Sequence, residues 1–303
     1  MSLDRAPGRP IRRILVTGAS GNVGAETVRA LRERARTGAS PDRVEIAAGV
    51  RDPGRYRPEA PDLRAVRLDF SDPGGWDTAL DGTDAVFLVR PPAISDVEAG
   101  IGPFIDRAAA RGVRKIVFLS LIGVESMPYV PHYKIEARIR SGGVPFVFLR
   151  PSFFMQNLST THRAEIADRD EIFVPAGKGR TNFVDVRDIG DAAAKVLLEP
   201  GHEGKAYELT GGESPDYFEI ARVLSEVLGR PIRYARPSAL RFLIRSVREG
   251  KPLAYALVMT GLYSASALGT PARASDDLER LLGRKPRDFR SFAVDNRSAW
   301  SRP

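Results

Sequence analysis

Six short apolar runs, separated by segments with helical spacing, limit most strongly what this 303-residue chain can fold into. Most runs are rich in β-branched or aromatic residues, and their apolar residues are mostly consecutive rather than alternate. This pattern is typical of strands that helices cover on both faces. Strands that alternate with helices predict an α/β fold with a doubly wound parallel sheet. The runs cover residues 14–16, 44–48, 63–68, 85–89, 116–119 and 146–149.

The segment after the first run is rich in glycine. Its glycines have GxxGxxG spacing, and it stands between a predicted strand and a helical pattern. Gly18 permits a tight turn, Gly21 lets the backbone approach a pyrophosphate, and Gly24 lets the helix pack closely. The N-terminus of that helix then faces the anion. We therefore expect a Rossmann dinucleotide site here, with a turn that binds no ligand as the alternative. The segment reads Thr17-Gly18-Ala19-Ser20-Gly21-Asn22-Val23-Gly24, and all of these except Ala19 are candidate cofactor residues.

The end of the second strand indicates which dinucleotide binds. NAD enzymes usually place Asp or Glu there to hold the ribose 2′-hydroxyl. This chain has Arg51 instead, and a guanidinium matches a 2′-phosphate in charge and in geometry. Arg12 and Arg13, just before the first strand, can add to that charge. We expect NADP(H) to be preferred over NAD(H); the alternatives are that Asp52 serves a ribose hydroxyl or that Arg51 is a solvated loop charge.

Two further segments follow strands and are candidates for cofactor contacts. Asp69 and Phe70 follow the third strand, where the Asp69 carboxylate can accept the adenine amino group or cap a helix instead. Val89-Arg90-Pro91-Pro92 follows the fourth strand and forms a stiff edge. Ligands of open α/β sheets bind outside the carboxyl ends of the strands, which is where both segments lie.

The character of the chain changes after residue 150. Residues 188–199 predict a helix and residues 206–209 a further short strand. Ser214-Pro215 predicts the start of a helix that ends at Gly229. Beyond residue 238 the pattern is mostly helical, with breaks at Pro252, residues 269–271 and Pro286. We expect a disordered leader at residues 1–10, an NADP-binding Rossmann core at 11–150, and a smaller, mostly helical C-terminal substrate lobe at 151–303 that interleaves with the core.

Composition excludes several classes of function. The chain has no cysteine, which excludes disulfides, thiolate zinc sites and thiol catalysis, and its three histidines form no ligand-spaced pair, so we expect no metal. No apolar stretch approaches the roughly 20 residues that cross a bilayer, and no secretion signal is present. We therefore expect a cytoplasmic protein without a membrane partner. The net charge is +8, but the basic residues are scattered arginines rather than one cluster, so we expect no nucleic-acid partner.

Five segments, in order along the chain, together resemble the NmrA-like atypical short-chain dehydrogenases. The most similar branch contains NAD(P)H:quinone oxidoreductases, triphenylmethane reductases and ergot-alkaloid-type reductases. The resemblance runs from about residue 12 to the C-terminus, and it implies NADP(H) binding and a C-terminal lobe that holds the substrate. The family also includes redox-sensing regulators that bind NADP(H). The segments are TGASGNVG at 17–24, GVRDP at 49–53, HYKIEARIRSGGVPFVFLRPSFFMQN at 132–157, FVDVRDIGDAAAKVL at 183–197 and YELTGGESPDYFEIARVLSEVLGRPI at 207–232.

The catalytic motif of ordinary short-chain dehydrogenases is only partly present. Ser120 occupies a plausible position for their serine, after the fifth strand, and we expect it to contact the cofactor. Their Tyr-x-x-x-Lys motif needs a tyrosine four residues before Lys134, and that residue is Val130. Tyr129 and Tyr133 stand at the wrong spacing, because a five-residue gap turns helical side chains ~140° apart. The tyrosine–lysine dyad is therefore absent.

Other residues of the same segment are candidates for catalysis. Family members often carry a lysine four residues before the glutamate that corresponds to Glu136, and here that position is His132. Imidazole can donate a proton near neutral pH, bond the nicotinamide ribose, or cap the helix. Lys134 is a second candidate unless it points into solvent, and Tyr133 can line the pocket. Pro151, Phe153 and Phe154 are expected beside the nicotinamide, although Phe154 suits core packing equally well.

These features predict an NADP(H)-dependent reductase that transfers hydride to a small, electron-poor organic substrate. Quinones, imines and conjugated carbonyls accept hydride with little help from a protein acid. A hydrophobic or aromatic substrate suits Tyr255, Met259, Leu262 and Tyr263, which are core residues otherwise. The alternatives are an NmrA-type redox sensor without turnover, and an isomerase or lyase that uses the cofactor structurally. An oligomer is compatible with the sequence.

Overall fold

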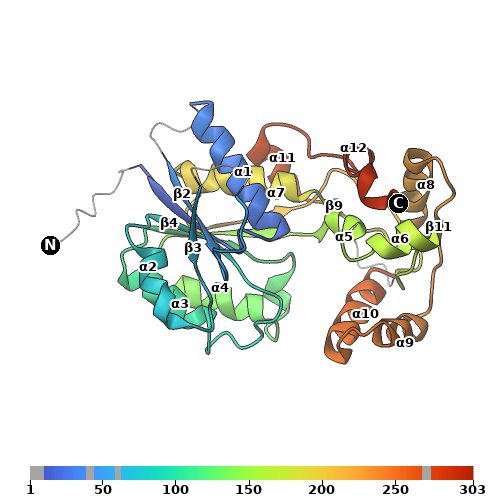
Figure 1. The fold of residues 1–303 in the computed structure, drawn as a ribbon, viewed down its shortest axis with the longest axis horizontal. Helices are drawn as coiled ribbons and strands as arrows, with labels where there is room; N and C mark the ends of the chain where they lie inside the picture. Colours follow the sequence, from blue (N-terminus) through green and yellow to red (C-terminus); the bar gives the residue numbers. More distant parts are fainter. Residues whose placement is uncertain (1–9, 39–43, 59–62, 268–273, 303) are drawn as a thin grey trace. The chain divides into compact units, whose positions relative to one another are not determined.

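The computed structural model describes residues 10–38, 44–58, 63–267 and 274–302, which fold into two compact units (Figure 1). Unit 1 contains the chain up to residue 151 together with residues 186–209, and unit 2 contains residues 152–185 and the chain from residue 210 onward. The predicted leader lies outside the described residues, except for Pro10. Residues 186–209, which the sequence places in a C-terminal lobe interleaved with the core, belong to unit 1.

Unit 1 is built on a seven-stranded parallel sheet with the strand order β10-β6-β5-β4-β1-β2-β3. The order reverses between β1 and β4, and open α/β sheets bind ligands beyond the carboxyl ends of strands at such a reversal. This architecture confirms the Rossmann fold. The strands are β1 (Arg13–Thr17), β2 (Glu45–Val50), β3 (Arg64–Arg67), β4 (Ala85–Val89), β5 (Lys115–Leu119), β6 (Phe146–Pro151) and β10 (Lys205–Leu209).

Helices cover both faces of this sheet. Helices α1 and α7 lie side by side on one face, and α2, α3 and α4 lie on the other (Figure 1). The packing of α1 on α7 is close, since a Cβ atom at Gly190 would lie 2.7 Å from the backbone of Glu26. This contact and the pairing of β10 with β6 are the reasons that residues 186–209 belong to unit 1. The helices are α1 (Asn22–Arg36), η1 (Pro73–Gly75), α2 (Trp76–Leu80), α3 (Ile101–Ala110), η2 (Val124–Ser126), α4 (Pro131–Ser141) and α7 (Val186–Leu198).

Unit 2 is mostly helical and has an aromatic core. The rings of Tyr217, Tyr234, Phe242 and Tyr263 pack edge to face or tilted within it. Its strands form two short parallel pairs, β7 with β9 and β11 with β8. Its elements are β7 (Phe153–Phe154), α5 (Gln156–Ser159), α6 (Arg163–Arg169), β8 (Glu171–Ile172), β9 (Phe183–Val184), α8 (Tyr217–Leu228), β11 (Arg233–Tyr234), α9 (Ala239–Arg248), α10 (Leu253–Ala267), α11 (Asp277–Leu282), α12 (Phe289–Asp295) and η3 (Arg297–Trp300).

Helix α8 begins two residues later than Ser214-Pro215 predicts. Asp216 is its N-cap, and its carboxylate accepts the backbone N–H of Glu219 at 2.8 Å while the Glu219 carboxylate accepts that of Asp216 at 2.8 Å. This reciprocal capping box outweighs the proline signal. The helix ends at Gly229, which has a φ of 67°, as the sequence predicts. The break predicted at residues 269–271 lies outside the described residues. Across the described part of the chain, no helix combines the length and apolarity needed to span a membrane.

Candidate cofactor site

The glycine-rich loop joins β1 to α1 at the carboxyl edge of the sheet. Gly18 has a φ of 62°, a left-handed conformation that glycine adopts without strain, and its carbonyl accepts the N–H of Gly21 at 2.9 Å. A Cβ atom at Gly24 would lie 2.2 Å from the Gly18 oxygen, so only glycine lets α1 begin this close to the loop. The Thr17 hydroxyl accepts the N–H of Val89 at 2.8 Å and ties the ends of β1 and β4 together.

The first turn of α1 offers donors to an anion. Gly21 is the N-cap and has no side chain to accept the N–H groups of the first turn, and that turn contains no acidic residue. Ser20, Gly21 and Asn22 are exposed. Free N–H groups and the positive end of a helix dipole together favour a phosphate. The loop therefore fits the pyrophosphate of a dinucleotide.

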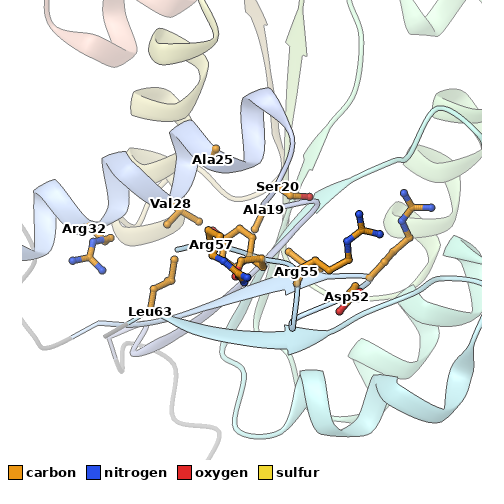
Figure 2. Close-up of a pocket in the computed structure, with 12 residues that line it drawn as sticks. Ala19, Ser20, Ala25, Val28, Arg32, Asp52, Arg55, Arg57 and Leu63 are labelled. Atoms are coloured by element: carbon orange, nitrogen blue, oxygen red, sulfur yellow. The ribbon is translucent and has the colours of Figure 1, made fainter. Parts of the chain in front are cut away.

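A hollow of about 640 Å³ lies beside this loop (Figure 2). It is bordered by Ala19 and Ser20 of the loop, by Arg32 on α1, and by the segment that follows β2. Figure 2 shows Arg55, Arg57 and Asp52 of that segment around the same hollow. Its charged lining consists of four arginines and one carboxylate, namely Arg32, Arg51, Arg55, Arg57 and Asp52.

The arginines of this hollow differ in the hydrogen bonds and ion pairs that they make. Arg51 and Arg55 are exposed, and neither has a carboxylate partner within the described part of the chain. Arg57 donates to the carbonyl oxygen of Gly54 at 2.8 Å. Asp52 accepts the N–H of Gly54 at 3.0 Å, which engages one oxygen of its carboxylate in a local turn. The hollow therefore has an excess of positive charge that fits a phosphate group.

Arg12 and Arg13 do not contribute to this charge, contrary to the sequence-based expectation. In the parallel pairing of β1 with β2, Arg13 lies opposite Glu45 and Thr17 opposite Gly49. Arg13 is thus at the amino edge of the sheet, one strand length from the loop, and its guanidinium pairs with the Glu45 carboxylate at 2.9 Å. The backbone N–H of Arg12 bonds Asp84 at 2.8 Å at the same edge.

Asp69 and Phe70 follow β3 and have local roles in the structure. The Asp69 carboxylate accepts the N–H of Ser71 at 2.8 Å, and its carbonyl accepts the Trp76 indole N–H at 2.8 Å. Asp72, rather than Asp69, caps the helical turn that follows. The Phe70 ring is buried against Phe104 with ring centroids 5.1 Å apart, so that only its backbone is available to an adenine.

Arg90 lies at the carboxyl end of β4, between Val89 and Pro91. It is half-buried, and burial lowers the pKa of its guanidinium. Its Nη1 donates to the carbonyl oxygens of Pro91 at 3.1 Å and Ile94 at 2.6 Å. No carboxylate among the described residues pairs with it. The residue therefore holds the loop in place and leaves a positive charge at the strand ends.

His132 is half-buried in the first turn of α4. Its ring stacks on Phe118 with centroids 5.9 Å apart, and its Nε2 lies 3.5 Å from the Nε donor of Arg90. Burial, and to a smaller extent the charge of Arg90, lowers the pKa of His132 to about 4. The imidazole is therefore neutral at physiological pH. It does not cap the helix, because α4 begins at Pro131 with Val130 as its N-cap.

Tyr133 and Lys134 point away from the core of unit 1. Tyr133 is 40% exposed and Lys134 is also exposed. Tyr129 is 76% exposed and precedes the start of α4, so it does not share a helix with Lys134. Of the three candidate catalytic residues, His132 alone packs into the unit.

A buried ionic network, which the sequence patterns do not predict, joins the ends of β5 and β6 to α4. Ser120 donates to the Glu136 carboxylate at 2.6 Å, and Arg150 donates to the same carboxylate from Nε at 3.0 Å and from Nη2 at 2.7 Å. Arg150 also bonds Glu125, and Arg140 bonds Glu136 at 3.1 Å. The Ser120 hydroxyl, expected to contact the cofactor, is engaged here. Glu136 lies one turn after His132, so the network fixes the turn that carries the imidazole.

The aromatic residues after β6 belong to unit 2. Pro151 ends β6 within unit 1 and is buried. Phe153 is half-buried and stacks on Tyr263 with centroids 5.9 Å apart, and Phe154 is half-buried in the same two-residue strand. Tyr263 is itself buried, and its hydroxyl lies 2.7 Å from Nε2 of His162.

Comparisons with known proteins place the chain among NmrA-like proteins. The model of the NmrA-like family matches residues 10–288. The chain is 32% identical over 286 residues to prestalk A differentiation protein A of Dictyostelium discoideum, covering 93% of this chain and 91% of that protein. It is 30% identical to the NAD(P)H azoreductase of Xenophilus azovorans, covering 95% of this chain and 99% of that protein. The NADPH complex of the quinone oxidoreductase QOR2 from Escherichia coli superposes with a TM-score of 0.81 at 23% identity, over 93% of this chain and 99% of that one.

Proposed function

Because this chain belongs to the NmrA-like family and is an oxidoreductase, we propose that it transfers hydride from NADPH to a small, electron-poor organic acceptor such as a quinone, an imine or a conjugated carbonyl. When bound, the nicotinamide supplies the hydride. The glycine loop and the first turn of α1 hold the pyrophosphate, and the arginine-lined hollow holds the adenosine end.

The observation that carries the preference for NADP(H) is the charge of the hollow. Its lining has four arginines and one carboxylate, and Arg51 and Arg55 have no carboxylate partner among the described residues. A 2′-phosphate compensates this positive charge, whereas a 2′-hydroxyl leaves it unbalanced. Asp52 lines the same hollow, but a local turn engages one of its oxygens. We therefore propose that Arg51 and Arg55 contact the 2′-phosphate.

The state of His132 supports an acceptor that needs little protein acid. With its pKa lowered to about 4, this imidazole carries no dissociable imidazolium proton at pH 7. Neutral imidazole still donates one hydrogen bond, which suits a ribose hydroxyl. Tyr133 and Lys134 are exposed and do not replace the missing dyad. We propose that His132 orients the cofactor, while the proton that completes the reduction comes from solvent.

The names of related proteins agree with acceptors of this class. One relative is named as an NAD(P)H azoreductase, and one structural neighbour as an NADPH-dependent quinone oxidoreductase. Azo groups and quinones both accept hydride without prior protonation by a strong acid. The redox-sensor alternative gains support from the missing dyad alone. Reductase names among relatives that match nearly the whole chain speak against it.

The test is oxidation of NADPH and of NADH by the purified protein against a panel of quinones, enals, imines, azo dyes and triarylmethane dyes. We expect turnover with NADPH, faster than with NADH, for at least one class of acceptor. The Gly21→Asp variant is the matched control, because its carboxylate repels the pyrophosphate while Gly21 is exposed and has a φ of −92°, which any residue adopts. Its Cβ atom would lie 3.3 Å from the Gly18 oxygen, a close contact that a small shift of the loop relieves. Tight NADP(H) binding without oxidation of any acceptor would contradict the reductase and favour the sensor.

A further inference from the structure

Helices α9 and α10 of unit 2 carry an apolar surface that the other elements of unit 2 leave uncovered. Twelve large hydrophobic side chains are exposed in the described residues, and eight of them lie on these two helices. The helices pack against each other, and Figure 1 shows them as neighbours. The eight residues, called the hairpin surface below, are Leu240, Ile244, Val247, Leu253, Tyr255, Leu257, Val258 and Leu262.

Helix α9 has its apolar stripe on the side opposite its buried face. Phe242 is buried, and at about 100° per residue Leu240, Ile244 and Val247 lie within a narrow stripe roughly opposite to it. These three side chains are 65%, 43% and 43% exposed. A surface helix of a globular protein normally presents polar residues on that side. The stripe therefore indicates a second apolar environment rather than the core of unit 2.

Helix α10 has no charged residue in its 15 positions, LAYALVMTGLYSASA. Among these residues only Ala256 and Tyr263 are buried. A helix that is apolar all round is normally enclosed by protein or by lipid. At 15 residues it is too short to cross a bilayer, which needs about 20 residues. A helix of this kind can lie in the plane of a membrane surface instead.

Four cations border the hairpin surface, and their charge indicates what kind of partner it binds. Arg236, Arg241 and Arg248 are exposed and Lys251 is half-buried, and none of them pairs with a carboxylate in the part of the chain that the structure describes. The one acidic residue between positions 236 and 267 is Glu249, which Arg169 and Arg245 neutralise at 2.9 and 3.0 Å. We call these four cations the rim. A second copy of this chain would place its own positively charged rim against this rim, and the two would repel each other. An anionic surface would instead compensate the positive charge of the rim.

We propose that the hairpin surface docks on the surface of an anionic phospholipid bilayer. The apolar side chains enter the boundary between headgroups and acyl chains, and the cations of the rim contact lipid phosphates. This proposal revises the expectation of no membrane partner, which rested only on the lack of a spanning segment. It does not depend on the coenzyme site, because the hairpin surface contains none of the cofactor residues. It gives a different role to Tyr255 and Leu262, which are exposed on this surface and which the sequence had suggested for contact with a hydrophobic substrate.

The test is co-sedimentation of the purified protein with vesicles of phosphatidylcholine alone and of phosphatidylcholine with one quarter phosphatidylglycerol. We expect binding to the anionic vesicles, at least about tenfold stronger than to the neutral ones, and weaker in high salt. Ile244→Gln with Leu257→Gln should abolish it. Arg241→Gln with Arg248→Gln should remove the preference for anionic vesicles.

Matched controls come from exposed residues elsewhere in unit 2. Val294→Gln, on α12, removes an apolar side chain that is 56% exposed, and Arg297→Gln removes an exposed cation; neither should alter vesicle binding. An unchanged circular dichroism spectrum and melting temperature show that each variant is folded. Binding to neither kind of vesicle, or equal binding to both, would overturn the proposal. So would a dimer, seen by light scattering, that Ile244→Gln with Leu257→Gln converts to a monomer.

Discussion

Replacement of Arg51 by alanine tests the coenzyme preference most directly. Arg51 is exposed beside the hollow and has no carboxylate partner among the described residues, so its removal leaves no buried charge unpaired. A charge-assisted hydrogen bond to phosphate contributes about 1.5–3 kcal/mol, and the low end applies to an exposed guanidinium. A loss of about 1.4 kcal/mol raises a dissociation constant tenfold. We therefore expect the Kd for NADPH to rise about tenfold, with Arg32, Arg55 and Arg57 retaining part of the attraction.

The measurement is a pair of titrations, with NADPH and with NADH, followed by nucleotide fluorescence or calorimetry. The Kd for NADH should change by less than about twofold, because NADH has no 2′-phosphate for the guanidinium to contact. Arg64→Ala is the control, since it removes an exposed arginine from the amino edge of β3. Equal losses of affinity for the two coenzymes would refute the role of Arg51. So would a similar loss in the Arg64→Ala variant.

Three further predictions concern the acid limb of stability, the ionic network and the glycine loop. The pKa of His132 falls from 6.5 unfolded to about 4 folded, so its contribution to stability is complete above pH 6.5 and is lost as the pH falls through 4. As the pH falls from 7 to 4, the free energy of unfolding in urea should decline less in His132→Gln than in the wild type, by at most about 3 kcal/mol. An NMR titration midpoint of His132 above pH 6 would contradict this prediction. Glu136→Gln should lower the free energy of unfolding by about 3 kcal/mol, because the buried Arg150 then keeps only one carboxylate partner, Glu125. A loss below about 1 kcal/mol would count against a stabilising role of the network. Gly24→Ala should lower the melting temperature, because its Cβ atom would lie 2.2 Å from the Gly18 oxygen. Gly21→Asp should abolish NADPH binding with little change in the melting temperature, since Asp at the N-cap of α1 offsets the close contact of its Cβ atom with the Gly18 oxygen. NADPH binding by Gly21→Asp would disprove the loop assignment.

The fold was predictable because its signals are local and repeated. Strands covered on both faces need apolar residues at consecutive positions, and every predicted run of unit 1 became a strand within one or two residues. The glycine spacing was equally informative, since Gly18 needs a left-handed φ and Gly24 a close helix. The order of segments along the chain was a weaker guide to which unit each segment belongs to. The segment 186–209 returns to unit 1 through contacts with α1 and β6, which lie far from it in sequence.

The side chains at the site were less predictable, because their roles depend on partners distant in sequence. Arg13 and Arg51 are both charges near strand ends, but Arg13 begins β1 and Arg51 follows β2, so the parallel pairing of these strands puts them at opposite edges of the sheet. Glu136 lies between the apolar residues of α4, and Arg150 ends an apolar strand. Their positions on inward faces were the one available signal that two charged side chains must meet in the interior.

The neutral state of His132 connects the electrostatics of unit 1 with the choice of acceptor. The pKa of this imidazole is low because the ring is buried on Phe118 and the Arg90 guanidinium lies beside it. A general acid works best with a pKa near the operating pH, and His132 lies about three units below pH 7. If His132 orients the cofactor as we propose, the reaction depends on the electrophilicity of the acceptor rather than on a protein acid. An unactivated ketone needs a proton as the hydride arrives, because the product is a strongly basic alkoxide. A quinone instead yields a phenolate whose charge is delocalised over an aromatic ring. The neutral His132 therefore supports our proposal of quinone-like acceptors rather than simple ketones.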